Sequence, residues 1–398
     1  MSAAGKPRFI LVGFALSEPG TMGGNSKIAL ELARHLRTTH EVHFIVPSGK
    51  VATITGTLGL EHGLTIHEVR DFVGGDLRHP LASARHCTNE LRRTLAALKV
   101  GRNDIVYSCS DFHVDTVPCR RLRSEFGFHW IAVQFLFVPF LFENLAKGYG
   151  FPAVKYLLVW IYSNLLFRYA RSGAEAFVIT NHSDLRHFPE AFRKRVFPYY
   201  GGVTVEQIPV GTVAKTRDVV FCSRLCPQKG ISGFLDVWKI VHERLPQARF
   251  TLIGNGDPAF ERMLRAKAES LGVMDSIDWM GYVNNEAKYD LYRSARVMVH
   301  PTVFDNNGMV AAEALCSGLP VVMYDLPPLR HVYTTGCVKV PFGDRRAFAE
   351  AVVRLLTDAD YAASVAPGAE QVAELRKHWD WASRAADFQA WLQTLALT

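Results

Sequence analysis

Residues 296–324 read "RVMVHPTVFDNNGMVAAEALCSGLPVVMY" and contain a complete strand–helix–strand pattern. The β-branched runs at 297–301 and 320–324 predict two buried strands. Between them the Ala-rich residues 309–315 predict a short helix, which the Gly-x-Pro step at 318–320 ends. Two strands joined by a helix are typical of a parallel sheet whose two faces are covered by helices.

Two carboxylates stand in this stretch, Asp305 in the loop and Glu313 inside the predicted helix. The first amides of a helix and its dipole favour an anionic or polyhydroxyl ligand. These amides would come from Asn307, Gly308, Met309 and Val310. A carboxylate accepts hydrogen bonds from hydroxyl groups, so Glu313 can hold a ribose and Asp305 a sugar. The alternative is that Asp305 only complements the helix dipole and that Glu313 is solvated.

The same alternation of strands and helices runs outward in both directions. In the second half we expect strands at 217–225, 249–254 and 277–280, and helices at 231–244, 259–271 and 285–294. In the first half we expect strands at 8–16, 41–46, 104–108 and 129–133, and a helix at 26–37. Two such α/β units in tandem predict two Rossmann-like, doubly wound domains that face each other across a cleft. Ligands of doubly wound sheets bind beyond the carboxyl ends of the strands.

A Gly- and Thr-rich stretch at 201–218 marks the boundary between the two halves. We therefore expect one domain at 1–208 and a second at 209–378. The amphipathic segment 379–398 is predicted to be a helix that can cross back to the first domain.

Composition excludes several classes of protein. With 398 residues, 48% hydrophobic and 21% charged, the chain is neither disordered nor collagen-like. The net charge of +7 favours anionic partners such as nucleotides or phospholipid surfaces, although ordinary surface charge is an equal alternative. The basic residues form no stripe, so we expect no nucleic-acid partner. The seven cysteines are odd in number and scattered, which is typical of a reducing compartment. The first apolar run is short, so we interpret it as a strand and not as a signal peptide. Both features predict a cytoplasmic protein.

Three loops that follow strands of the second half carry candidate binding residues. Arg224 and Lys229 lie in "SRLCPQKG" (223–230) and can converge on one diphosphate, or can be solvated turn residues. Gly254 and Gly256 in "LIGNGDP" (252–258) allow close backbone approach but lack the full Gly-x-Gly-x-x-Gly pattern of nicotinamide sites. The third loop holds Tyr282 and Val283, which can flank a nucleobase or simply pack.

The order of these segments over 217–345 resembles the family 4 retaining glycosyltransferases of the GT-B fold, also called glycosyl transferases group 1. The Glu-x7-Glu signature of that family, whose glutamates contact the sugar and the ribose of a nucleotide-sugar donor, stands here as Asp305-x7-Glu313. The resemblance implies transfer of a sugar from a nucleotide-diphosphate sugar to an acceptor, with retention of configuration and without a metal or other cofactor. It also implies that the domain at 209–378 is mainly donor-binding and the domain at 1–208 acceptor-binding. We expect catalytic roles for Asp305 and for Arg224 and Lys229, whose positive charges can neutralise the departing nucleoside diphosphate.

In the first half the resemblance is confined to a few positions. Gly23 and Gly24 correspond to the glycine loop that approaches the donor phosphates, and Gln134 stands where many members carry a histidine. His113 and His129 lie near that position in the sequence, but we interpret them as surface or strand-edge residues. Asp305 is also one methylene shorter than the family's glutamate, which favours a changed donor preference.

The apolar stretch 135–173, with Lys147, Lys155, Arg168 and Arg171 interspersed, has two interpretations. It can dip into a bilayer interface at the inner face of the cytoplasmic membrane and receive a lipid-linked saccharide, as in polysaccharide or glycoconjugate biosynthesis. It can equally be a core helix under the first sheet. Two other functions stay open: a nucleotide-sugar epimerase or phosphorylase of the same fold, and an inactive subunit that binds a partner glycosyltransferase.

Overall fold

The computed structural model describes residues 7–17, 23–59, 63–71, 79–138, 153–211 and 213–397, apart from the side chains of residues 153 and 155. By their internal contacts these residues form two compact units. The first unit contains the described residues up to 138, Ala153–Gly201 and the chain from Trp381 onward, and the second unit contains Gly202–Asp380. No described helix is long and apolar enough to cross a membrane.

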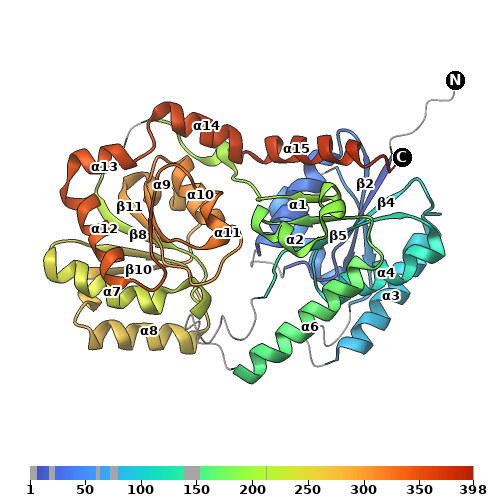
Figure 1. Ribbon diagram of the computed structural model, residues 1–398, viewed down its shortest axis with the longest axis horizontal. Helices are drawn as coiled ribbons and strands as arrows, with labels where there is room; N and C mark the ends of the chain where they lie inside the picture. Colours follow the sequence, from blue (N-terminus) through green and yellow to red (C-terminus); the bar gives the residue numbers. More distant parts are fainter. Residues whose placement is uncertain are drawn as a thin grey trace. The chain divides into compact units, whose positions relative to one another are not determined.

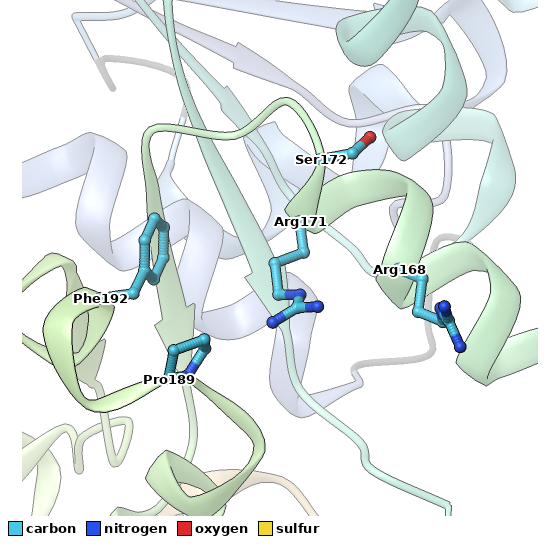
Figure 2. A pocket seen from close by; sticks show the side chains of 5 residues that line it. All are labelled: Arg168, Arg171, Ser172, Pro189 and Phe192. Atoms are coloured by element: carbon cyan, nitrogen blue, oxygen red, sulfur yellow. The ribbon is translucent and has the colours of Figure 1, made fainter.

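The first unit is built on a parallel sheet with the strand order β3-β2-β1-β4-β5-β6-β7 in the described residues (Figure 1). Its strands are β1 (Arg8–Val12), β2 (Glu41–Pro47), β3 (Thr65–Val69), β4 (Ile105–Ser108), β5 (His129–Gln134), β6 (Ala176–Ile179) and β7 (Val196–Pro198). Its helices are α1 (Gly24–Leu36), α2 (Val51–Leu58), α3 (Pro80–Ala97), α4 (His113–Phe126), α6 (Ala153–Arg171) and α15 (Trp381–Thr394). Helix α6 ends beside the segment that carries Pro189 and Phe192 (Figure 2).

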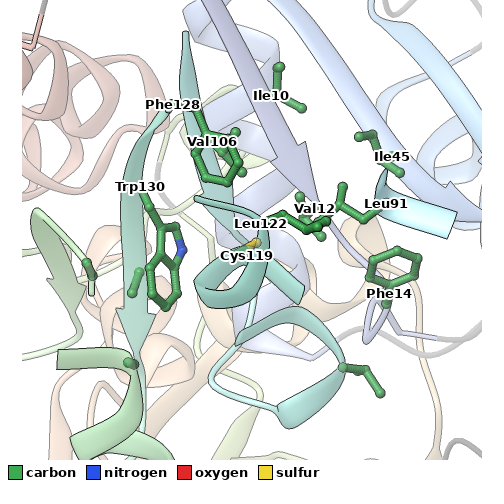
Figure 3. Close-up of a cluster of buried hydrophobic side chains, with 14 of the residues drawn as sticks. Ile10, Val12, Phe14, Ile45, Leu91, Val106, Cys119, Leu122, Phe128 and Trp130 are labelled. Carbon is green, nitrogen blue, oxygen red and sulfur yellow. The ribbon is translucent and has the colours of Figure 1, made fainter. Parts of the chain in front are cut away.

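Alternate residues of the central strands form the core of the first unit. Ile10 and Val12 on β1, Val106 on β4 and Trp130 on β5 are fully buried on one face of the sheet (Figure 3). Side chains two apart in a strand point to the same face, so α3 and α4 can cover all of them. Leu91 of α3 and Cys119 and Leu122 of α4 pack on this face (Figure 3).

The second unit repeats the architecture with the strand order β10-β9-β8-β11-β12-β13. Its strands are β8 (Arg217–Cys222), β9 (Phe250–Ile253), β10 (Ile277–Gly281), β11 (Ala295–His300), β12 (Val321–Tyr324) and β13 (Cys337–Val340). Its helices are α7 (Ile231–Arg244), α8 (Pro258–Ser270), α9 (Asn285–Ser294), α10 (Met309–Cys316), α11 (Pro327–Arg330), α12 (Arg345–Thr357), α13 (Ala359–Val365) and α14 (Ala369–Trp379). Both sheets are wholly parallel, and the strand order reverses between β1 and β4 and between β8 and β11. The doubly wound α/β class predicted from the sequence is therefore confirmed.

The chain crosses between the units at positions that differ slightly from the expected ones. The first unit ends at Gly201 rather than at residue 208. The residues between belong to the second unit because Val203 bridges to Asp380 and Gln207 accepts a hydrogen bond from Asn285 on α9. After Asp380 the chain returns to the first unit, where α15 packs on α1 and Phe388 contacts aromatic rings of that sheet, including Phe9.

Candidate active site

The loop after β8 packs directly on the loop after β11, its neighbour at the point where the strand order reverses. Gly230 makes this possible: its φ is +70°, and a Cβ at this position would lie 1.9 Å from the carbonyl oxygen of Pro301. The Gln228 carbonyl accepts hydrogen bonds from the Thr302 hydroxyl (3.1 Å) and the Val303 amide (3.0 Å). The Gln228 side chain donates in turn to the carbonyl of Phe304 at 2.8 Å. These contacts fix the position of residues 228–230 relative to residues 301–304.

Lys229 and Asp305 meet across these two loops. The Lys229 ammonium Nζ lies 2.5 Å from Asp305 Oδ2, and both side chains are largely buried, with 18% and 12% of their surface exposed. The second carboxylate oxygen of Asp305 accepts hydrogen bonds from the amides of Asn307 and Gly308 at 3.3 and 3.2 Å. Asp305 therefore ties a cation to the start of α10.

His300, the last residue of β11, lies beneath this ion pair with Nε2 3.7 Å from Asp305 Oδ2. Burial would raise the pKa of Asp305, but Lys229 and His300 outweigh it and lower the pKa to about 2. Burial lowers the pKa of His300 to about 4, against the opposing effect of Asp305. At neutral pH the cluster consequently holds an ionised carboxylate and a neutral imidazole.

Gly308 immediately precedes helix α10, and its left-handed conformation (φ +62°) suits glycine and turns the chain into the helix. The Tyr333 hydroxyl lies 2.7 and 2.8 Å from the carbonyl oxygens of Asn307 and Gly308 and holds this turn from below. The following amides, those of Met309 and Val310, lack partners within the helix, as the first amides of any helix do. The predicted helix N-terminus thus exists, and the predicted residues form it.

Glu313 is not solvated: its Oε2 lies 2.8 Å from the Lys288 ammonium on α9, and only 16% of the Glu313 side chain is exposed. Burial would lower the pKa of Lys288, but Glu313 outweighs it and raises the pKa. Lys288 is therefore protonated at neutral pH. One oxygen of Glu313 is held by Lys288, which orients the carboxylate.

Arg224 lies on the same loop as Lys229, but its side chain is exposed and has no ion-pair partner among the described residues. Gly254 and Gly256 were predicted to bring their backbone close to a ligand. In the structure they lie close to another part of the chain, the loop after β8. Their Cβ atoms would lie 1.9 Å from the Ser223 carbonyl oxygen and 2.1 Å from that of Leu225. Tyr282 is 74% exposed at the end of β10, followed by the partly exposed Val283. Any contact of these residues with a donor stays a prediction.

The residues predicted in the first half lie in the first unit. Gly23 precedes α1 and donates to the Ser17 hydroxyl at 3.0 Å, and a Cβ on Gly24 would meet no atom within 4 Å. Gln134 ends β5, and its amide nitrogen donates to the Leu136 carbonyl at 2.8 Å and to Asp111 at 3.3 Å. Gln134 therefore holds the loop that follows its own strand.

The interpretation of His113 as a surface residue is wrong. Its side chain is buried, and its two ring nitrogens lie 2.9 Å from the Ser83 hydroxyl and 2.6 Å from the Tyr162 hydroxyl. His113 begins α4 on the side that faces α3 and α6, and so it links three helices. His129 does lie at the start of β5, where it pairs with Glu175.

Comparison with known proteins agrees with this geometry. The family model of glycosyl transferases group 1 matches residues 216–358. This match covers most of the second unit. It is similar to a phosphatidyl-myo-inositol mannosyltransferase of Mycobacterium leprae, with 35% identity over 45% of this chain and 47% of that protein. It is also similar to mannosylfructose-phosphate synthase of Agrobacterium fabrum, with 33% identity over 26% of this chain and 24% of that protein. The chain thus spans half or less of the length of these relatives.

Solved structures match the whole chain. Sucrose-phosphate synthase from Thermosynechococcus elongatus has a TM-score of 0.77 at 17% identity, covering 99% of this chain and 100% of that one. HepE of Anabaena, in complex with UDP and glucose, has a TM-score of 0.74 at 14% identity over 97% of this chain and 99% of that one. These matches establish the GT-B fold for this chain.

Several residues of the site were not predicted from the sequence. Lys288, His300 and Tyr333 contact predicted residues, and Gln228 joins the two loops that carry Lys229 and Asp305. A signal existed for Lys288, because it stands four positions before the buried Tyr292 and hence on the inward face of α9, where a cation needs a partner. Gln228 and Tyr333 carried no signal, because each acts on a segment distant in the sequence. His300 stands only five residues before Asp305, but the strand pattern did not show that its side chain lies against that carboxylate.

Proposed function

We propose that this protein transfers a sugar from a nucleotide-diphosphate sugar to an acceptor hydroxyl, with retention of configuration. The observation that carries the proposal is the Lys229–Asp305 pair at the start of α10, with Arg224 exposed on the same loop. The family match and the UDP and glucose bound in the HepE structure support the same activity.

The second unit would bind the donor through its positive groups. Lys229 has three donor positions and uses one on Asp305, so the others can reach a phosphate oxygen. Arg224 would add a planar fork to the same diphosphate, and the first amides of α10 would face the anion. As the glycosyl bond breaks, negative charge grows on the leaving phosphate, and cations fixed in advance stabilise it most effectively.

The carboxylates would orient the donor. Glu313, whose orientation Lys288 fixes, can accept from ribose hydroxyls, and Asp305 can accept from sugar hydroxyls while ionised. Tyr282 and Val283 would lie beside the nucleobase, Gly254 and Gly256 would let the intervening loops pack closely, and Gly23, Gly24 and Gln134 would contribute from the first unit. The acceptor would be a saccharide or a lipid-linked saccharide, reached by a cytoplasmic enzyme through peripheral contact with a membrane.

A thermal-shift screen against nucleotide sugars tests the donor class directly. A ligand that binds only the native state at a hundred times its Kd stabilises that state by about 2.7 kcal/mol, which raises the melting temperature. The exposed Arg224→Ala variant should keep the melting temperature of the free protein and lose most of the shift. An equal shift in that variant would contradict the assigned role of Arg224.

Product analysis with the purified chain separates the remaining functions. Transfer or hydrolysis of a nucleotide sugar by the chain alone would rule out an inactive partner subunit. Formation of an epimer without an acceptor would indicate an epimerase, and a requirement for inorganic phosphate would indicate a phosphorylase. Either result would replace the transferase proposal.

A further inference from the structure

Helix α6 exposes a continuous apolar face. Val154, Leu158, Ile161 and Leu165 are 75%, 62%, 40% and 63% exposed. Their spacings of four, three and four residues put them on one side of the helix. The opposite side is buried, with Phe167 and Ala170 packed into the core of the first unit. An exposed apolar face of this length on a helix that is otherwise well packed indicates a binding surface.

Apolar exposure in the first unit concentrates at this helix. Tyr169 is a fifth exposed large apolar side chain on α6, and the others that the described part of this unit exposes are Leu81, Phe112 and Leu136. Phe112 immediately precedes His113, which contacts Tyr162 in the middle of α6 and Ser83 in the first turn of α3. Leu81 near the start of α3, Phe112 and the apolar face of α6 therefore belong to one region of the unit, where α6 lies beside α4 and α3 (Figure 1).

The face runs into a basic pocket at the C-terminal end of α6. A shallow pocket of about 370 Å³ is lined by Arg168, Arg171, Ser172, Pro189 and Phe192. Figure 2 shows the Arg171 side chain extending from α6 toward Pro189, with Arg168 one turn earlier and pointing outward. Both arginines are exposed, and neither has an ion-pair partner in the part of the chain that the structure describes.

Further positive charge surrounds this pocket, and acidic residues are few. Phe192 stands in the run Glu190–Arg195, whose last three residues are Arg193, Lys194 and Arg195. On the other side Arg120 lies over the Tyr169 ring and donates to Ser172. Helix α6 itself contains no acidic residue. A second copy of the chain would bring the same excess of positive charge to this surface, which disfavours self-association through it.

We propose that the apolar face of α6 and the basic pocket at its end form a docking surface for an anionic phospholipid bilayer. The apolar side chains would enter the interfacial layer, and Arg168 and Arg171 would bind the phosphates of the headgroups. The inference rests on the membrane contact in the proposed function and names the surface that makes it. That surface lies outside the donor site, so a failure of either proposal can be told apart from a failure of the other.

Sedimentation of the full chain with vesicles tests the proposal. Vesicles of phosphatidylglycerol and phosphatidylcholine should bind the protein, those of phosphatidylcholine alone should bind it weakly, and high salt should reduce the difference. The double variant Arg168→Glu/Arg171→Glu should partition to the anionic vesicles at least about tenfold more weakly. The variant Leu158→Ser/Leu165→Ser should lose binding in high salt as well, because it removes the apolar contribution.

A matched control lies on α8 of the second unit, where Arg262 and Met263 are adjacent and exposed. The variant Arg262→Glu/Met263→Ser should bind vesicles like the native chain. Hydrogen exchange should show that vesicles protect α6 but not α8. All four proteins should respond alike to a nucleotide sugar in the thermal-shift screen, which keeps this test separate from that of donor binding.

Three results would overturn the inference. The first is the absence of binding to anionic vesicles at low salt. The second is equal binding by the α6 variants and the native chain. The third is a native dimer that the Leu158→Ser/Leu165→Ser variant converts to a monomer without any change in vesicle binding, since a second copy would then cover the face.

Discussion

Lys229 Nζ lies 2.5 Å from Asp305 Oδ2, although the two residues stand 76 positions apart in the chain. Each follows one of two strands that are adjacent in the sheet, β8 and β11. Asp305 thereby holds the Lys229 ammonium in place with one carboxylate oxygen, while its other oxygen contacts the start of α10. The predictions below follow from this pair and the contacts around it.

Lys229→Ala should lower turnover at least ~10²-fold, as expected when one group that stabilises developing charge is removed. It should also destabilise the fold by about 3 kcal/mol, because it leaves a buried carboxylate unpaired. Steady-state kinetics well below the melting temperature would separate the two effects. Lys239→Ala on α7, which removes only an exposed helical pair with Glu243, is the control and should change neither quantity much.

The double variant Lys229→Met/Asp305→Asn sharpens that test. It removes both charges together, so most of the lost stability should return while turnover stays low. Recovery of activity together with stability would mean that Lys229 has only a structural role.

Stability should fall in two steps as the pH is lowered. The folded state keeps His300 neutral with a pKa of about 4, whereas an unfolded histidine binds a proton near pH 6.5. Stability is then lost between about pH 6.5 and 4, by up to about 3 kcal/mol. Asp305, with a folded pKa of about 2, adds a further loss between about pH 4 and 2. Denaturant titrations across this range should show that His300→Asn flattens the upper step and also shrinks the lower one, because His300 helps to lower the pKa of Asp305. An unchanged upper step would mean that His300 does not cause it.

Lys288→Met should weaken donor binding more than it lowers the rate at saturating donor, because Lys288 only orients Glu313. Glu313→Gln should have a similar effect, and the two changes should not add when they are combined. The coupling energy between residues in such a pair is about 1–3 kcal/mol. Isothermal titration calorimetry of the native chain, the two single variants and the double variant with a nucleotide-sugar analogue would measure it. Fully additive effects would show that the two side chains act separately.

Gly230→Ala should destabilise the protein by about 2 kcal/mol or more and reduce activity. The new methyl group would collide with the Pro301 carbonyl, and φ at this position is +70°. Gly233→Ala, three residues further along in α7, meets no atom within 4 Å and should stabilise the protein by up to about 1 kcal/mol. Thermal unfolding of both variants would compare the two positions, and equal behaviour would contradict the close packing of the two loops.

The sequence alone was sufficient to predict the α/β class, most strands of the second unit and the helix that starts at Met309. These features arise from short-range patterns of apolar, small and turn-forming residues. Short strands such as β3, β7 and β13 were not predicted, because three to five residues at or near a sheet edge carry little pattern. His113 was misjudged because a polar residue at a helix start is usually exposed, and its partners Ser83 and Tyr162 are distant in the chain.

Only the tertiary structure decided which predicted residues share a site. The strand order puts β8 beside β11, and this brings Lys229 to Asp305. The packing of α9 over the same strands brings Lys288 to Glu313, a partner that no local pattern specified. Side-chain charge and helix propensity are properties of neighbouring residues, whereas an ion pair depends on the distance between atoms that only the folded chain brings together.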